Sequence, residues 1–444
     1  MKIERAVWSQ LVSWKNNPAR KPLIIQGARQ VGKTWLLKEF GREEFEGLAY
    51  FSFDENPELK QFFQTTKDVN RIIQNLSLVY GKPIVPGKTL LILDEIQECN
   101  EALNALKYFC ENAPEYAVAG AGSLLGVALA RGESFPVGKV DFIDLHPLTF
   151  MEFLKAADPG LSSFCSSNLT VEPIPELFFN RLSEKFKMYL ISGGMPEAVT
   201  ALLERQDIEQ TQTVLSNILR ANMLDFSKHV DNKDIPKIGT VWASLPSQLA
   251  RENKKFLYQT VKPGARAREY EDALNWLTHA GLVHKVYRNI KPGLPMATYD
   301  DLSAFKLYLY DVGLLRRMSF LDPVAIKEGN RLFVEFKGAL AENYILQSIM
   351  NQFEGTPRYW TSGNLAEVDF LIQYRNQIIP AEVKSGENVK GKSLGWYQKQ
   401  FNPPVRIRYS MQNLRFDDGL LNIPLFLADH TRRYLEIVTR DAKE

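Results

Sequence analysis

Residues Leu23 to Thr34 read Leu-Ile-Ile-Gln-Gly-Ala-Arg-Gln-Val-Gly-Lys-Thr, an apolar strand that runs into a turn with two glycines and then into a helix. The stretch matches the pattern G-x-x-x-x-G-K-[ST], in which backbone N–H groups surround a polyphosphate and the helix N-terminus adds positive potential. We expect Lys33 to contact the β- and γ-phosphates of ATP and the Thr34 hydroxyl to ligate Mg²⁺. The residues expected to bind the nucleotide are Gly27, Ala28, Arg29, Gln30, Val31, Gly32, Lys33 and Thr34. The alternative is a chance glycine turn before a helix.

A second stretch, Thr89 to Glu95, is an apolar run that ends in two carboxylates. This pattern is typical of a buried parallel strand whose carboxyl end faces a phosphate site. We expect Asp94 to hold Mg²⁺, directly or through water, and Glu95 to polarise the attacking water. A solvated helix cap is the alternative for this pair.

The composition indicates a globular chain of two to four domains, with 444 residues of which 45% are hydrophobic. No run approaches the roughly 18 apolar residues of a membrane helix, and Met1 to Arg5 carries charge, so we expect a cytoplasmic protein without a membrane partner. The cysteines, Cys99, Cys110 and Cys165, are too scattered for a disulfide framework or a zinc site. A net charge of +2 does not by itself indicate a nucleic-acid partner.

Strands and helices alternate through the first third of the chain. A helix is expected from Val7 to Trp14, a strand over 49–54, a helix from Pro57 to Leu76 and a strand over 116–120. Together with the two stretches above, this alternation predicts a parallel α/β sheet.

Two further residues of this region are candidates for catalysis. Ser123 follows the strand at 116–120, where a short polar side chain could sense the γ-phosphate; a helix N-cap is an equally good interpretation. Arg131 is a candidate for an arginine supplied to the nucleotide of a neighbouring subunit, a contact worth about 10³–10⁵ in rate where it operates. A plain surface arginine is the alternative for Arg131.

The middle of the chain is helical. Residues 161–225 predict a helical lid, and Ile235 to Arg288 predicts two short helices over 241–245 and 247–250, a third helix and a strand, which together are typical of a winged helix-turn-helix. Cations gather near the start of the third helix and are expected to contact DNA: Lys254, Lys255, Lys262, Arg266 and Arg268. The alternatives are a structural module or one that contacts protein, since charge runs are usually solvated faces.

The last polar group of residues lies on a helix and a hairpin. Glu342 is midway along a helix over 336–346, Asp369 is on a strand over 367–372, and Glu382 and Lys384 share one face of the returning strand over 378–384. These are the parts of a Mg²⁺-dependent phosphodiesterase site, in which Glu342, Asp369 and Glu382 hold the metal and Lys384 orients or activates water. The alternative is a salt-bridged hairpin without chemistry.

The D…E-x-K arrangement resembles the restriction-endonuclease-like PD-(D/E)XK superfamily, with Val368 in place of the proline. Across nearly its whole length the chain also resembles a large prokaryotic family of AAA-type ATPases fused to a C-terminal endonuclease-like domain of long-unassigned function. The motifs that carry this resemblance are the loop ending at Thr34, Gly122 to Gly126, Ser134 to Lys139, Pro147 to Phe150, Gly193 to Glu197 and Lys337 to Glu342.

This resemblance implies four domains: an AAA+ ATPase core (1–155), a helical lid (156–230), a winged helix (231–318) and an α/β nuclease-like domain (319–444). It implies ATP and Mg²⁺ as cofactors and a homo-oligomer, with a hexameric ring as one candidate form. The leading hypothesis is an ATPase that acts on DNA, with branched or junction DNA as the first substrate to test. The alternative is a nucleotide-switched signalling or defence module that binds a protein partner and whose nuclease-like domain is inactive.

Overall fold

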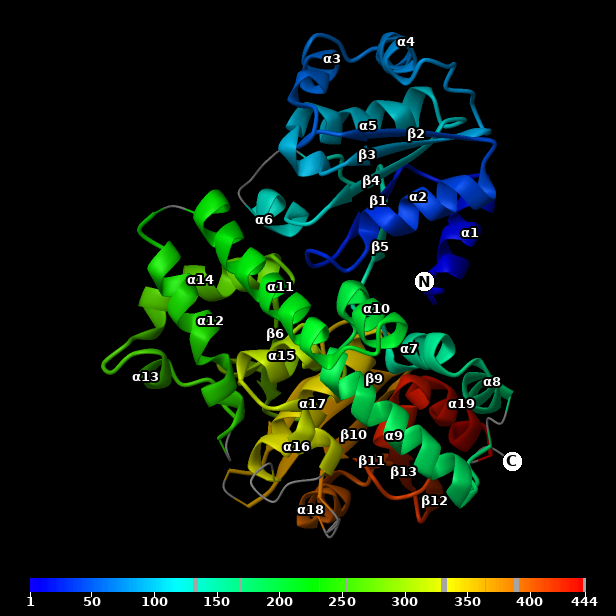
Figure 1. The fold of residues 1–444 in the computed structure, drawn as a ribbon. Helices are drawn as coiled ribbons and strands as arrows, with labels where there is room; N and C mark the ends of the chain where they lie inside the picture. The colour runs from blue at the N-terminus through cyan, green and yellow to red at the C-terminus, as the bar shows by residue number, and fades with distance from the viewer. Residues whose placement is uncertain are drawn as a thin grey trace. The chain divides into compact units, whose positions relative to one another are not determined.

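A five-stranded sheet forms around the strand that leads into the glycine turn (Figure 1). Its strands are β1 (Leu23–Gln26), β2 (Gly47–Ser52), β3 (Thr89–Asp94), β4 (Ala117–Gly122) and β5 (Asp141–Asp144). In this computed structural model the order is β2-β3-β4-β1-β5, and every neighbouring pair runs parallel. The predicted parallel α/β sheet is confirmed. The order brings the carboxyl ends of β1 and β3 to the same edge, with only β4 between them.

The structure describes residues 1–130, 135–167, 170–230, 232–251, 254–328, 334–363, 365–386 and 391–441. The chain folds into two units. The parallel-sheet unit comprises Glu4–His146 with His279–Leu282, and the mixed-sheet unit comprises Met1–Ile3, Pro147–Thr278 and Val283–Glu444. Within the described ranges, no helix is both long enough and apolar enough to cross a membrane.

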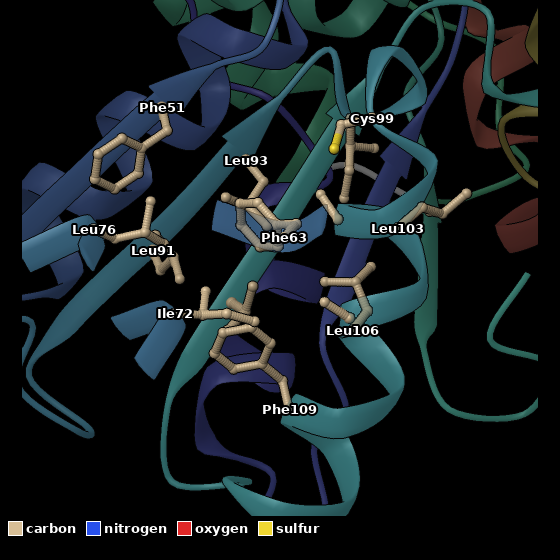
Figure 2. Close-up of a cluster of buried hydrophobic side chains, with 14 of the residues drawn as sticks. Phe51, Phe63, Ile72, Leu76, Leu91, Leu93, Cys99, Leu103, Leu106 and Phe109 are labelled. Atoms are coloured by element: carbon tan, nitrogen blue, oxygen red, sulfur yellow. The ribbon is translucent and has the colours of Figure 1, made fainter. Parts of the chain in front are cut away.

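Helices cover both faces of the parallel sheet. They are α1 (Trp8–Asn16), α2 (Lys33–Glu44), α3 (Lys60–Gln64), α4 (Val69–Tyr80), α5 (Asn100–Asn112) and the short α6 (Leu125–Ala130). Figure 2 shows the core on one face, where Phe63 of α3, Ile72 of α4 and Leu106 of α5 pack against Leu91 and Leu93 of β3. The α2 helix packs on the other face of the sheet, and α1 packs against α2. Burial of both faces explains why β3 is apolar at every position before Asp94 except its first.

The mixed-sheet unit contains an eight-stranded sheet in the order β12-β13-β11-β10-β9-β8-β6-β7. Its strands are β6 (Val283–Asn289), β7 (Asp300–Leu309), β8 (Arg358–Thr361), β9 (Glu367–Tyr374), β10 (Gln377–Val383), β11 (Arg406–Ser410), β12 (Arg415–Asp417) and β13 (Leu420–Pro424). The predicted hairpin is β9–β10, which pairs antiparallel, whereas β10, β11 and β13 pair parallel. The sheet is therefore mixed, and the predicted boundary between residues 318 and 319 falls between two strands of it.

The helices of this unit are α7 (Phe150–Ala157), α8 (Pro159–Ser167), α9 (Glu176–Ser192), α10 (Pro196–Glu204), α11 (Ile208–His229), α12 (Ile235–Leu249), α13 (Tyr258–Val261), α14 (Ala267–His279), α15 (Val312–Met318), α16 (Pro323–Glu328), α17 (Val334–Met350), α18 (Lys392–Phe401) and α19 (Thr431–Asp441). Side chains cap several of their starts: Thr149 and Glu152 form a capping box on α7, and Asp207 caps α11.

Two local predictions differ from the structure. The helix expected from Pro57 to Leu76 is broken, because Asp68 accepts the Asn70 N–H and begins α4 as a separate helix. The two short helices expected around Pro246 are instead the single helix α12. Trp242 and Leu249 are buried on opposite sides of that proline, and we attribute the continuity of the helix to packing that outweighs the lost backbone hydrogen bond.

A buried aspartate joins two helix ends of the mixed-sheet unit. Asp311 accepts the Leu314 N–H at 2.9 Å, which caps α15, and the Gly194 N–H at 2.7 Å, which lies just before α10. Burial raises the pKa of Asp311 to about 6, while these N–H donors oppose the shift. The backbones approach closely here: a Cβ on Gly313 would lie 2.4 Å from the Ser192 carbonyl oxygen.

We predict that Gly313→Ala destabilises the chain by about 1–3 kcal/mol, because the added methyl group meets backbone atoms that cannot move aside. Urea unfolding monitored by circular dichroism measures the change. Gly239→Ala in α12 is the matched control: a Cβ there meets nothing within 4 Å, and the change should stabilise by up to ~1 kcal/mol. Equal stability of Gly313→Ala and the unchanged chain would contradict this account of the junction.

Candidate functional site: the phosphate loop and a buried charge cluster

The glycine turn follows β1 and leads directly into α2, as the sequence predicts. Gly27 has φ +152° and Gly32 has φ +96°, and a Cβ on Gly27 would lie 2.1 Å from the Leu145 carbonyl oxygen, so this position requires glycine. The side chain of Lys33 folds back over the loop, and its ammonium donates to the carbonyl oxygens of Gly27 and Ala28 at 2.8 Å each. The loop thus surrounds its own lysine at the helix N-terminus.

Thr34 and Asp94, which lie far apart in the sequence, are in direct contact. The Thr34 hydroxyl donates to Asp94 Oδ2 at 2.8 Å, and the Tyr50 hydroxyl donates to the same oxygen at 2.8 Å. Two hard oxygen ligands therefore lie side by side at the carboxyl edge of the sheet, which is the donor chemistry that Mg²⁺ prefers. The residues present fit a Mg²⁺ ion bound together with phosphates.

Glu95 contacts the candidate sensor Ser123. The Glu95 carboxylate accepts the Ser123 hydroxyl at 3.1 Å and the side-chain amide of Gln97 at 2.6 Å. Its backbone is left-handed, with φ +47°, a conformation that non-glycine residues rarely adopt and that turns the chain directly after β3. The candidate base and the candidate sensor are thus brought together.

Burial lowers the pKa of Lys33 to about 8, although the carboxylates of Glu95 and Asp94 oppose this shift. A polyphosphate close to this ammonium would favour its charged form. Arg131 lies outside the described residues, so its role as an arginine supplied to a neighbouring subunit stays a prediction.

The carboxylates of the predicted phosphodiesterase site are only partly brought together, and a buried lysine lies among them. Lys306 of β7 is fully buried. Its ammonium lies beside three carboxylates, those of Glu342, Glu367 and Asp369. Lys254 pairs with Glu342 as well. Glu382, in contrast, pairs with Lys384 at 2.8 Å.

The charged groups of this cluster shift one another's pKa values. Burial, followed by the neighbouring Glu342 carboxylate, raises the pKa of Asp369 to about 7. Burial alone would lower the pKa of Lys306, but the surrounding tyrosine and carboxylate groups raise it well above its usual value. In the described ranges, no three His, Cys, Asp or Glu side chains are grouped so as to hold a metal ion. The metal role of Glu342, Asp369 and Glu382 stays a prediction.

The predicted cluster of DNA-contacting cations is divided. Lys254 is engaged by Glu342, and Lys255 forms a backbone bridge with Lys306, so both lie next to the charge cluster. The remaining cations are exposed around the start of α14: Lys262, Arg266 and Arg268. Only these three present a basic surface of the kind predicted.

Four residues of these sites carry no role predicted from the sequence: Tyr50, Gln97, Lys306 and Glu367. The position of Tyr50 beside Asp94 depends on β2 pairing with β3, which no local pattern shows. A signal for Lys306 was present, because the lysine interrupts the apolar run from Phe305 to Leu309, and a charged residue there indicates a buried partner.

Three segments of the chain match models of known domain families. Residues 19–154 match the model of an AAA domain, and this part of the chain is an AAA-type P-loop ATPase domain. Residues 183–325 match a domain of unknown function (DUF8612), and residues 337–427 match another (DUF4143). No curated protein matches the chain.

Two solved structures are distantly similar. The Walker-type ATPase PABY2304 of Pyrococcus abyssi is 14% identical, with 72% of this chain and 96% of that chain covered and a TM-score of 0.45. The Orc1 protein of Aeropyrum pernix, solved in complex with DNA, is 12% identical, with 73% and 94% covered and a TM-score of 0.29. Both likenesses are too distant to assign a role to any residue of this chain.

We predict that ATP binding takes up a proton between about pH 8 and pH 10. Lys33 has a pKa of about 8 in the free protein, and phosphates raise it, so binding weakens as pH rises above about 8. Calorimetry in two buffers with different ionisation enthalpies, at about pH 9, measures the uptake. Lys33→Arg, which stays charged, should bind without it. Binding by the unchanged chain without proton uptake would contradict the prediction.

Proposed function

We propose that the chain binds Mg²⁺ and ATP at the phosphate loop and hydrolyses the nucleotide. The observation that carries this proposal is the pair of contacts joining Thr34 to Asp94 and Ser123 to Glu95 at one edge of the sheet. The AAA domain match over residues 19–154 supports it. Thr34 and Asp94 would hold Mg²⁺, directly or through water, and the ion would neutralise charge on the phosphates.

Lys33, Glu95 and Ser123 would have separate roles in binding and hydrolysis. The Lys33 ammonium leaves the carbonyls of Gly27 and Ala28 and moves to the β- and γ-phosphates, while the loop amides bind their oxygens. Glu95, released from Ser123, orients a water molecule in line with the γ-phosphate and accepts its proton. Ser123 then contacts the γ-phosphate and reports whether it is present. The Ser123–Glu95 contact therefore represents a resting arrangement of the base.

We predict that Glu95→Gln lowers the ATPase rate by about 10²–10⁴-fold, because the amide cannot accept the proton from water. Nucleotide affinity should change far less than the rate, since Glu95 acts on Lys33 through its charge and has its hydrogen bonds with Ser123 and Gln97. Phosphate release and fluorescent-nucleotide titration measure the two quantities. Glu98→Gln removes a nearby carboxylate and should leave both unchanged. A Glu95→Gln variant with full activity would rule out this residue as the base.

We propose further that the ATPase acts on DNA. Three helices, α12 to α14, precede the β6–β7 hairpin, which is the element order of a winged helix, and exposed cations surround the start of α14. This is the part of such a module that contacts phosphates. ATPase assays with duplex, single-stranded and four-way-junction DNA identify the preferred form. Light scattering with and without nucleotide tests the proposed homo-oligomer.

We predict that reversing the exposed cations weakens DNA binding and flattens its salt dependence, by up to about 0.9 in log–log slope for each phosphate that is no longer neutralised. The reversed residues are Lys262, Arg266 and Arg268. The charge-matched control reverses three other exposed cations, Lys67, Arg71 and Lys82. Fluorescence anisotropy at several salt concentrations measures both properties. Equal weakening in the two triple variants would mean that net charge, rather than this surface, is responsible.

A second candidate function is a nucleotide-switched module that binds a protein partner and does not cleave DNA. The observation that favours it is the engagement of the predicted nuclease residues by lysines of the same chain. ATPase activity that no DNA form stimulates, together with a protein that co-purifies, would favour this candidate over the first.

A further inference from the structure

The Lys306 ammonium lies beside two of the carboxylates predicted for the phosphodiesterase site, Glu342 and Asp369. It lies 3.8 Å from Asp369 Oδ1 and 4.0 Å from Glu342 Oε2, and it pairs with Glu367. Its side chain has no exposed surface. A lysine ammonium is a compact point charge, so it can neutralise several carboxylates at once, as a metal ion does.

Other donors contact the oxygens of Glu342 and Asp369. Glu342 Oε1 pairs with Lys254, and Oε2 accepts the Tyr308 hydroxyl at 3.1 Å. Asp369 Oδ2 accepts the backbone N–H of Val383 at 2.8 Å. A divalent ion would have to displace these donors as well as Lys306, and it would be repelled by two ammonium groups.

Glu382 and Lys384 form an ion pair of their own, at 2.8 Å. The second oxygen of Glu382 is buried and accepts no hydrogen bond from the residues that the structure describes. The Lys384 ammonium of the E-x-K pair therefore neutralises Glu382, while Lys306 and Lys254 neutralise the other carboxylates.

The position of Lys306 is fixed by the fold. Asn343, the neighbour of Glu342 on α17, accepts the Leu309 N–H and donates to the Leu309 carbonyl oxygen, at 2.9 Å each. This pairing ties α17 to the end of β7. Lys306 lies within the matched region 183–325 and its three carboxylates within 337–427, so both regions build the cluster.

We infer that Lys306, assisted by Lys254, is a built-in counter-cation that replaces the divalent metal expected at the D…E-x-K site. The carboxylates of this site bind ammonium groups of their own chain and take up no Mg²⁺ or Mn²⁺. Without a cation, the buried Glu342 carboxylate and the partly exposed carboxylates of Glu367 and Asp369 would repel one another, so the lysines stabilise the mixed-sheet unit. This inference is independent of the proposed ATPase.

The test uses the full chain without nucleotide, so that the phosphate loop does not contribute, and Mn²⁺ as the probe. Calorimetric titration of the unchanged chain and of Asp369→Asn should give the same result, with no Mn²⁺ binding that depends on Asp369. Binding that Asp369→Asn abolishes would overturn the inference. This comparison does not require any lysine variant to fold, and ATPase activity is measured separately.

Lys306→Met provides the complementary test. We predict that its Tm falls by about 5 °C or more, because the carboxylates lose their counter-cation, and that Mn²⁺ or Mg²⁺ partly restores it. Adding Asp369→Asn should recover stability by removing one charge and should abolish the rescue by metal. Lys285→Met is the matched control, since this lysine of β6 donates to the Asn275 amide oxygen rather than to a carboxylate. An unchanged Tm in Lys306→Met would overturn the inference.

Discussion

The hydrogen bond between the Thr34 hydroxyl and the Asp94 carboxylate joins the two stretches on which nucleotide chemistry depends. Thr34 lies in the first turn of α2 and Asp94 ends β3, and the two meet because only β4 separates β1 from β3 in a parallel sheet. The apolar core on both sheet faces holds that order. Every other feature of the site, from the folded-back Lys33 to the Glu95–Ser123 contact, follows from these two chain segments ending at one edge.

In the mixed-sheet unit, the main constraint on the structure is that buried carboxylates need partners. A carboxylate removed from water must find hydrogen-bond donors or cations. Asp311 accepts hydrogen bonds from backbone N–H groups next to α10 and in α15, whereas Glu342 and Asp369 lie beside lysine ammonium groups. A metal-dependent hydrolase and a cluster neutralised by lysines of its own chain can therefore contain the same types of acidic residue. The two differ in the cation that lies beside the carboxylates.

Two matched regions of unknown function belong to one physical unit. The β6–β7 hairpin lies in the region 183–325 and pairs with β8 of the region 337–427 in a single sheet. The Asn343–Leu309 hydrogen bonds and the Lys306 cluster cross the same boundary. We infer that the two regions depend on each other for stability, because neither alone satisfies the buried polar groups of the other.

The sequence by itself determined the phosphate loop, the acidic end of β3, the parallel sheet and the β9–β10 hairpin. Each depends on contiguous residues: glycine spacing, an uninterrupted apolar run, or alternation about a short turn. Only the tertiary structure decided that Tyr50 reaches Asp94, that Pro246 lies within a continuous helix, and that the Lys306 ammonium lies beside Asp369. These outcomes depend on which strands become neighbours and which charges become buried together, and such long-range pairings leave no periodicity in the chain.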